Sequence, residues 1–270
     1  MTVLIIGGNG FLGAELVHRS TAAGHATDAT FTTRPGSAPG ITWHALDLRD
    51  AERVAAVVAA VGPSLVVNAT SGGPDWAITA EGPVHLAMAA AKHGCRLVHV
   101  SSDAVFSGTR VHYDESCLPD PVTPYGAAKA AAETGVRLVH PDPVVARTSL
   151  IIGDLRSVHV RAVHDLATGT RKGVLFTDDI RCPVHVTDLA AALLELAASD
   201  AHGIHHLAGT DAMSRHELGT LIAGRDGLDA SRLPARGTSL PWGLERLPEI
   251  GEQSDLVAPI HSIGALSPKT

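Results

Sequence analysis

The sequence predicts an α/β protein with a Rossmann-like, doubly wound parallel sheet and a small C-terminal substrate lobe. Two patterns lead to this expectation. Through the first two-thirds of the chain, short apolar segments alternate with longer helical ones, which is typical of successive βαβ units. Segments such as LVVNA, residues 65–69, are mostly apolar, as in strands that helices cover on both faces.

Each expected element follows from its local pattern. Apolar runs bounded by turn residues indicate strands, and apolar residues spaced three or four apart indicate helices. We expect strands over residues 2–8, 28–34, 41–48, 64–70, 96–102 and 144–153, and helices over 10–24, 51–62, 82–94 and 125–139.

The pattern becomes less regular after residue 153. We expect a loop and helix over 154–173, a short strand or loop and then a helix over 175–199, a strand over 203–209 and a helix over 213–227. The proline- and glycine-rich end shows no clear period and is expected to be irregular. This gives a dinucleotide-binding core over 1–152, a small substrate-binding lobe over 153–232 that partly returns to the core, and an irregular tail over 233–270.

Composition favours an enzyme of small molecules. The formal net charge is −7 and basic residues form no block, which argues against nucleic-acid and membrane-surface partners. The chain shows neither a signal peptide nor a membrane-spanning segment. Its three cysteines are far apart and lack zinc spacing, so we expect a cytoplasmic protein without disulfides.

Histidine spacing does not indicate a metal site. His205 and His206 are adjacent in an expected strand, so their side chains should lie on opposite faces of the sheet. We therefore interpret these histidines as strand or surface residues rather than as metal ligands, and we expect no bound metal.

Glycines follow the first strand at a spacing that predicts a dinucleotide site. Gly7, Gly10 and Gly13 enclose Phe11 and Leu12, directly after a strand and at the start of a helix. Such glycines let the backbone approach a pyrophosphate, whose charge is stabilised at the helix N-terminus. A glycine-rich turn without a ligand is the alternative.

The second strand ends without an acid, and this favours NADPH over NADH. NAD-binding proteins commonly place a carboxylate there for the ribose hydroxyls, whereas this chain has Thr33 and Arg34. Arg34 could bind a 2′-phosphate, or it could be a solvated loop residue. Further cofactor contacts are expected from Asp47, Leu48, Ala69 and Thr70. For Asp47, which could meet the adenine, a turn-forming role is the alternative.

Tyr125 and Lys129 form a candidate acid–base pair in YGAAK. Residues four apart share one face of a helix, so the phenol and the ammonium can converge. A free tyrosine has a pKa of about 10, which a nearby positive charge lowers toward neutrality. Ser102 ends an expected strand 23 residues earlier, so glycine turn, serine and tyrosine–lysine pair occur in a characteristic order.

Several motifs together resemble one family of enzymes. GGNGFLG, VVNAT, VSSDAVFSG, YDESCLPDPVTPYGAAKAAAE, VVARTSLIIG and RCPVHVTDLA cover roughly residues 1–210. With them the chain resembles the extended short-chain dehydrogenase/reductases, and among these most closely the dTDP-4-dehydrorhamnose reductase family.

The resemblance implies a specific reaction. A nucleotide-linked 4-keto-6-deoxy sugar would receive hydride from the nicotinamide of NADPH. By motif, Ser102 would hydrogen-bond the substrate carbonyl, Tyr125 would protonate its oxygen, and Lys129 would bind the nicotinamide ribose. Related 4,6-dehydratases carry Thr-Asp-Glu at the strand end, whereas Ala104 stands here in place of the glutamate. We therefore expect reduction rather than dehydration.

Substrate contacts are expected from Asp103, Trp76, Arg147 and Arg181. Three of them have a structural alternative: Asp103 as a turn cap, Trp76 as a core residue, and Arg147 as the partner of a structural acid. Two other functions are weighed, a non-catalytic NAD(P)-binding regulatory protein and a reductase of another small carbonyl compound. A homodimer is compatible with the resemblance.

Overall fold

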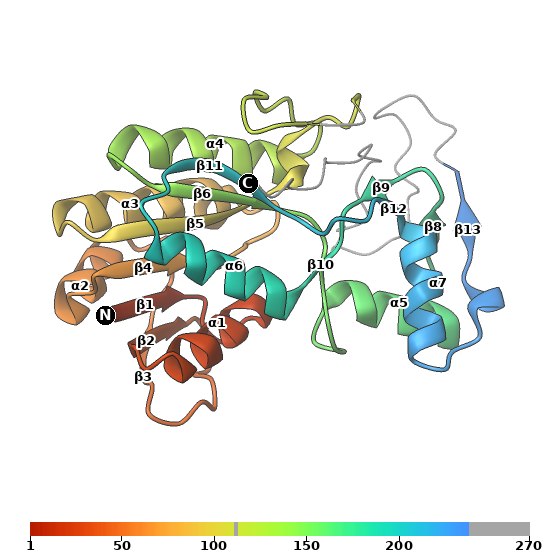
Figure 1. Ribbon diagram of the computed structural model, residues 1–270, viewed down its shortest axis with the longest axis horizontal. Coiled ribbons are helices and arrows are strands. Elements are labelled where there is room, and N and C mark those ends of the chain that lie inside the picture. The colour runs from red at the N-terminus through yellow and green to blue at the C-terminus, as the bar shows by residue number, and fades with distance from the viewer. Residues whose placement is uncertain (111–112, 238–270) are drawn as a thin grey trace.

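The computed structural model describes residues 1–110 and 113–237 of the chain. Its core is a seven-stranded sheet in which every pair of neighbours is parallel. Figure 1 shows this sheet between two layers of helices. In spatial order the strands are β11 (Gly203–Leu207), β6 (Val144–Thr148), β5 (Arg96–Ser102), β4 (Leu65–Asn68), β1 (Thr2–Ile6), β2 (Ala26–Phe31) and β3 (Thr42–Ala45). The predicted Rossmann-like fold class is confirmed.

The two faces of the sheet are covered by different helices. Val3 and Ile5 of β1 share one core with α1 (Phe11–Ala22) and α6 (Val186–Ala198). Leu4 and Ile6 point to the other face, where α2 (Ala51–Val61), α3 (Gly82–Lys92) and the buried side of α4 (Pro124–Val139) cover them. Because side chains alternate along a strand, a continuous apolar run such as VLII serves both cores.

A π-helix replaces the expected loop before α3. This helix, η1 (Ala77–Glu81), runs into α3, and the Gly82 N–H donates to the Ala77 carbonyl five residues back. The Thr79 hydroxyl is buried, donates to the Gly73 carbonyl at 2.9 Å and accepts from the Gly72 N–H at 3.1 Å. Thr79 thus fastens the loop that follows β4 to this helix.

The lobe at the right of Figure 1 has its own small core. It consists of α5 (Val158–Thr168) and α7 (Arg215–Arg225), with the short strands β8 (Leu175–Phe176), β9 (Ile180–Arg181), β12 (Met213–Ser214) and β13 (Ala235–Arg236) and the short helix η3 (Ala230–Arg232). Between them the chain returns to the sheet through α6 and β11. The numerical boundary between core and lobe stays a prediction.

Most expected strands are shorter in the structure, and three of the differences affect predicted site residues or the path of the chain. The second ends at Phe31 and the third at Ala45, so Thr33, Arg34 and Asp47 lie in loops. The expected strand over 144–153 is interrupted after Thr148, and the chain resumes as β7 (Ile151–Ile152), which pairs with β10 (Val184–His185). The predicted irregular tail contains the two-residue strand β13, which pairs with β8; from residue 238 on the tail lies outside the described residues, and its predicted start stays a prediction.

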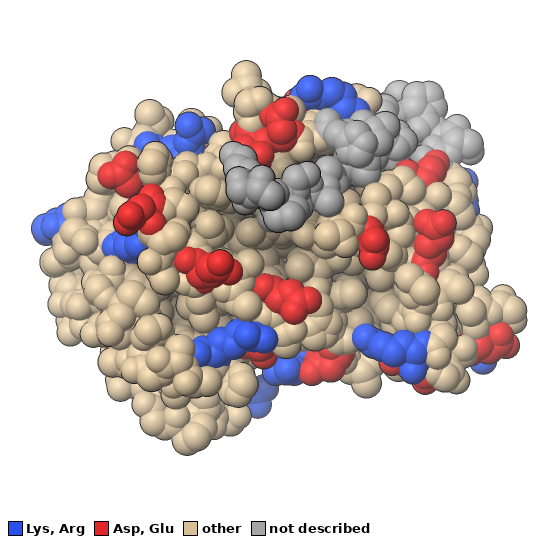
Figure 2. All heavy atoms as spheres, in the orientation of Figure 1, with Lys and Arg blue, Asp and Glu red and all other residues tan. Residues whose placement is uncertain are grey.

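The surface shows both signs of charge. On the face drawn in Figure 2, acidic and basic side chains are interspersed rather than gathered by sign. Among the described residues, no helix has the length and apolar character needed to cross a bilayer.

Candidate active site

The glycine-rich turn after β1 leaves no room for side chains. Gly7 has φ +76°, a region that L-residues with a Cβ rarely adopt, and a Cβ there would lie 2.8 Å from Thr70 Cγ2. A Cβ on Gly13 would overlap the Gly7 carbonyl oxygen. The Gly10 N–H closes the turn by donating to that same oxygen at 2.9 Å. The three glycines therefore permit a close packing of strand, turn and helix.

The N-terminus of α1 suits an anionic ligand. Gly10 is the N-cap and, in the described part of the chain, no side chain caps this helix end. The first N–H groups of a helix have no partners within the helix, and here no acidic residue occupies the first turn. The exposed backbone dipoles of Phe11 and Leu12 thus fit the pyrophosphate of a dinucleotide.

The loop after β2 is tied to the glycine turn. Asn9 Nδ2 donates to the Arg34 carbonyl oxygen at 2.9 Å, which holds residues 32–34 beside the start of α1. Thr33 and Arg34 are exposed, and the Arg34 guanidinium forms none of the ion pairs found among the described residues. The guanidinium is therefore available to a phosphate on the ribose of a bound cofactor.

Asp47 and Leu48, at the turn after β3, make contacts within the protein. Asp47 accepts from the Arg49 backbone N–H at 3.0 Å and from its guanidinium at 2.5 Å. The Arg49 side chain lowers the pKa of this carboxyl. Leu48 is buried against Gly82. For Asp47 the turn-forming alternative is the geometry observed, and its contact with adenine stays a prediction.

Ala69 and Thr70 connect the glycine turn to the catalytic side. Ala69 is half-buried, and Thr70 Oγ1 donates to Asn68 Oδ1 at 2.6 Å. The methyl of Thr70 abuts Gly7, while its carbonyl lies 3.5 Å from Lys129 Nζ. One residue at the carboxyl end of β4 thus touches both halves of the site.

Lys129 is buried beneath the carboxyl ends of β4 and β5. Its Nζ donates to the Val100 carbonyl at 3.0 Å, and the residue is 2 % exposed. Burial lowers the pKa of Lys129 to about 8, and the charge of Glu133 one turn further along α4 opposes this shift. Lys129 therefore changes its charge close to physiological pH.

The first turn of α4 lies against the end of β5 because position 126 is glycine. A Cβ on Gly126 would overlap the carbonyl oxygen of Ala104, which belongs to the short helix η2 (Asp103–Val105). Thr123 caps α4 and accepts from the Gly126 N–H at 2.9 Å. The close approach brings Tyr125, the neighbour of Gly126, to the segment that carries Ser102. Gly126 was not among the predicted site residues, although a glycine inside an expected helix can indicate such a contact.

Ser102 lies at the carboxyl end of β5 and is half-buried. Its Oγ accepts from the Ala104 N–H at 3.1 Å and lies 3.2 Å from Asp103 Oδ1, to which it donates. Ser102 is thus the N-cap of η2 as well as the candidate carbonyl anchor.

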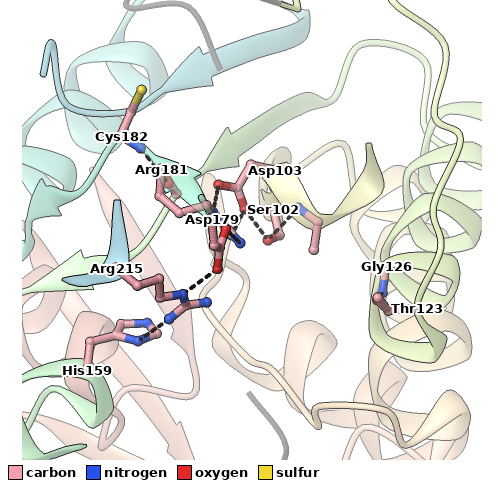
Figure 3. Close-up of polar contacts among 11 residues, drawn as sticks. Ser102, Asp103, Thr123, Gly126, His159, Asp179, Arg181, Cys182 and Arg215 are labelled. Carbon is pink, nitrogen blue, oxygen red and sulfur yellow. Dashed lines mark hydrogen bonds and ion pairs between the residues drawn. The ribbon is translucent and has the colours of Figure 1, made fainter. Parts of the chain in front are cut away.

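Asp103 is held by a chain of buried charges that the sequence did not predict (Figure 3). Arg181 of β9 donates to both carboxylate oxygens, through Nε at 2.9 Å and Nη2 at 2.5 Å. Arg181 Nη1 also lies 3.7 Å from Asp179, which accepts from Arg215 Nε at 2.7 Å. Burial lowers the pKa of Arg181, but Asp103 and Asp179 outweigh burial and raise it. Tyr125 also acts on this pKa through space.

His159 ends this chain in the lobe. Its Nδ1 lies 3.4 Å from Arg215 Nη1. Burial, together with the positive charges of Arg215 and Arg181, lowers the pKa of His159 to about 3. The imidazole is therefore neutral at physiological pH and can accept a hydrogen bond from Arg215.

The other predicted substrate residues lie apart from this arrangement. Arg147 is 1 % exposed and binds Glu133 through Nε at 3.0 Å and Nη2 at 2.7 Å, so its guanidinium is committed inside the core. This pairing with a structural acid is the alternative considered for Arg147. Trp76 is 50 % exposed just before η1, so it is not the core residue of its alternative. Asp103 and Arg181 pair with each other. For all four, a contact with substrate stays a prediction.

The expectation that the protein binds no metal stays a prediction. Within residues 1–110 and 113–237, no cluster of three or more His, Cys, Asp or Glu side chains is arranged to hold an ion.

Fold and site together define a class of protein. A parallel sheet with a glycine turn after its first strand, and a serine, a tyrosine and a lysine gathered at the carboxyl end of β5, are the features of an extended short-chain dehydrogenase/reductase. The family model described as RmlD substrate binding domain matches residues 1–246. The chain belongs to this family, as its motifs predicted.

Several relatives of this chain are named as reductases, and others are named as a spore coat polysaccharide biosynthesis protein and as a subunit of methionine adenosyltransferase. The chain is 29% identical over 248 residues to the probable low-salt glycan biosynthesis reductase Agl14 of Haloferax volcanii, covering 86% of this chain and 82% of the relative. It is 32% identical over 174 residues to the dTDP-4-dehydrorhamnose reductase of Mycobacterium tuberculosis, covering 62% and 57% of the two chains. The structure of a Bacillus anthracis dTDP-4-dehydrorhamnose reductase in complex with NADP shares the fold, with a TM-score of 0.77, 23% identity, and 98% and 90% of the two chains covered.

Proposed function

We propose that this protein is an NADPH-dependent reductase of a nucleotide-linked 4-keto-6-deoxy sugar. The observation that carries the proposal is the convergence at the end of β5. There Ser102 ends the strand, the Gly126 contact holds the start of α4 against η2, and Lys129 is buried under the Val100 carbonyl. A serine, a phenol and an amine in this arrangement suit proton transfer to a carbonyl oxygen. The Mycobacterium tuberculosis relative, a dTDP-4-dehydrorhamnose reductase, supports this class of substrate, and the Haloferax volcanii relative supports a reduction in glycan biosynthesis.

Each of the three side chains has a distinct part in the reduction. Ser102 would donate a hydrogen bond to the substrate carbonyl and hold its oxygen near Tyr125. Tyr125 would give its phenolic proton to that oxygen as negative charge develops on it. Bound NADPH supplies the hydride to the carbonyl carbon.

Lys129 would support Tyr125 electrostatically. A protonated Lys129 one helical turn away favours the phenolate that remains after proton transfer, which lowers the pKa of Tyr125. Its own pKa of about 8 means that this support weakens as pH rises above that value. The same ammonium would bind the nicotinamide ribose.

The glycine turn and Arg34 support the choice of cofactor. The uncapped start of α1 would bind the pyrophosphate through backbone N–H groups, with Gly7, Gly10 and Gly13 allowing close approach. Arg34 would pair with the 2′-phosphate that distinguishes NADPH from NADH. NADH is expected to bind more weakly. A cytoplasmic location and a homodimer stay predictions.

Turnover of defined substrates tests the proposal. Purified protein is titrated with NADPH and with NADH, and cofactor oxidation is then followed with a panel of dTDP-4-keto sugars. We expect tighter binding of NADPH and oxidation with at least one 4-keto-6-deoxy sugar. Tight NADPH binding without oxidation by any carbonyl compound would refute the reductase and leave the non-catalytic NAD(P)-binding protein. Oxidation by simple ketones alone would identify a reductase of another small carbonyl substrate.

Tyr125→Phe is the matched variant for the catalytic acid. It retains the ring and removes only the proton donor, so cofactor binding should persist. Turnover should fall by about 10²-fold or more, in line with the usual contribution of general acid catalysis. Unchanged turnover in this variant would refute the role of Tyr125.

A further inference from the structure

The carboxylate that follows Ser102 faces inward toward the lobe. Asp103 is 1 % exposed, and Arg181 binds both of its oxygens. Asp103 belongs to the core, because it follows β5 directly, whereas Arg181 lies on β9 of the lobe. This bidentate pair therefore joins the lobe to the residue beside the candidate carbonyl anchor.

Beyond the Asp103–Arg181 pair, buried side chains of alternating charge continue into the lobe. We call this series, from Asp103 through Arg181 and Asp179 to Arg215, the ion chain. Asp179 lies between Arg181 and Arg215, and Arg215 reaches neutral His159. Each charge in this chain is buried and faces a charge of opposite sign, which compensates for its loss of water. Removal of one member leaves each of its neighbours with one opposite charge fewer. The position of Arg181 is thus determined from both sides (Figure 3).

Asp103 and the substrate carbonyl compete for the hydrogen bond that the Ser102 hydroxyl donates. The Ser102 hydroxyl can donate only once, and here it donates to Asp103 Oδ1 at 3.2 Å. This distance is long for an O–H···O bond, whose usual value is about 2.7–2.8 Å. Because Arg181 binds one lone pair of each carboxylate oxygen and offsets their negative charge, Asp103 is a weakened acceptor for Ser102. The Ala104 N–H donates to a lone pair of Ser102 Oγ, so the hydroxyl proton of Ser102 stays free to rotate toward another acceptor.

We propose that Arg181 is a positioning residue: through Asp103 it sets the Ser102 hydroxyl to donate to the substrate carbonyl, and the ion chain makes this setting depend on the docked lobe. The inference rests on the proposed reductase function. It gives Arg181 a role different from direct substrate contact, which the sequence had suggested.

A double-mutant cycle on turnover tests the dependence on Ser102. The full chain is prepared as Arg181→Met, Ser102→Ala and the double variant, and kcat, KM and the Kd of NADPH are measured with a dTDP-4-keto-6-deoxy sugar that the wild type reduces. We expect Arg181→Met to lower kcat by about 10²-fold, the usual scale for a misplaced group. NADPH affinity should stay within about twofold. In the Ser102→Ala background, the same change should lower kcat by less than about threefold.

Equal losses of kcat in both backgrounds would overturn the proposal, since they would show that Arg181 acts independently of Ser102. A rise in KM that persists without Ser102 would instead assign Arg181 to the substrate. Arg181→Lys retains the charge but not the two-pronged geometry, so it should recover only part of kcat. Arg19→Met, which breaks the surface pair with Glu15 on α1, is the control and should leave kcat unchanged.

Folding and the proposed function are controlled separately. If Arg181→Met does not fold, Asp103→Asn replaces it in the same cycle, with the same expected dependence on Ser102. A wild type that reduces none of the sugars refutes the reductase, and the positioning role with it. The melting temperatures of Asp103→Asn, Arg181→Met and their double variant then test the ion pair between Asp103 and Arg181 independently of turnover. The pair is present if the two losses of stability are strongly non-additive.

Discussion

Lys129 shows how the site depends on the solvation of one amine. The side chain is held by the Val100 carbonyl and shielded from water, so its protonated form is less stable than in the unfolded chain. The lowered pKa follows from the burial of Lys129 between α4 and β5, and the close contact that holds α4 near β5 lies three residues earlier, at Gly126.

This burial predicts a pH-dependent stability. Between the folded pKa of about 8 and the ordinary lysine pKa of 10.5, the unfolded chain binds more protons at Lys129, so stability rises with pH in this range. Lys129→Met removes this dependence. The difference in free energy of unfolding, wild type minus variant, should therefore increase by up to about 3 kcal/mol across this window. Urea denaturation at a series of pH values measures it. Lys92→Met, at an exposed position on α3, should show a flat difference; a flat result for Lys129→Met would contradict the burial of its charge.

Arg34 is predicted to select the cofactor. Arg34→Ala should weaken NADPH binding by about 10- to 100-fold, the loss expected for a charge-assisted hydrogen bond to a phosphate. NADH, which lacks the 2′-phosphate, should bind nearly as before. Isothermal titration of both cofactors measures the ratio. Arg137→Ala, at an exposed position on α4, is the control. Equal weakening of both cofactors would remove Arg34 from the specificity.

At the scale of elements, the junction of α4 with η2 determines the site. Gly126 lets the backbone of α4 touch the Ala104 carbonyl, and Thr123 fixes where the helix begins. A backbone contact therefore helps to position the first turn of α4, which carries Tyr125, and any atom added at position 126 would change the distance between α4 and η2.

Gly126→Ala should separate these elements and reduce catalysis. The new methyl must displace the first turn of α4 from η2, and with it Tyr125 from Ser102. We expect kcat to fall by about 10²-fold, the scale for a small misplacement of reacting groups. Gly224→Ala is the matched control, because a Cβ on this α7 glycine would meet no atom within 4 Å. Steady-state kinetics of both variants, with circular dichroism to confirm folding, distinguishes them; full activity of Gly126→Ala would contradict the close approach.

Local sequence patterns predicted most helices and strands, but they did not predict contacts between residues that lie far apart in the sequence. Alternating apolar segments predicted the strands, and Ser102, Tyr125 and Lys129 followed from their places at a strand end and on one helix face. The break after Thr148 and the π-helix at Ala77–Glu81 were missed because both depend on packing around them. The Asp103–Arg181 pair was missed because 78 residues separate the partners, and no local period links them.

For the whole molecule, the ion chain is one of the contacts that join the lobe to the end of β5. The lobe has a core of its own, and its attachment to Asp103 uses charge rather than apolar area. Such an attachment is directional, because each arginine must meet its carboxylate at a set angle. The orientation of the lobe therefore depends on a few groups.

Asp179→Asn should loosen the lobe while leaving the core intact. The variant leaves Arg181 and Arg215 with one carboxylate fewer, and breaking a buried pair commonly costs about 3–5 kcal/mol. Hydrogen exchange should become faster in β9, β12 and α7, while amides of β1 and β4 keep their protection. Asp154→Asn, which alters an exposed pair with Arg156, should change neither region. Uniform acceleration across both regions would indicate that lobe and core unfold as one unit.

The π-helix before α3 has a consequence for how length changes affect this protein. A π-turn amounts to one residue inserted into an α-helix, and each residue of an α-helix turns the chain by about 100°. The extra residue in Ala77–Glu81 thus rotates what precedes it, including half-exposed Trp76, relative to α3. A single deletion there should regularise the helix and swing the indole around its axis while α3 stays in place. A change in length of one residue at this point should therefore alter the surface around Trp76 without a change in the core.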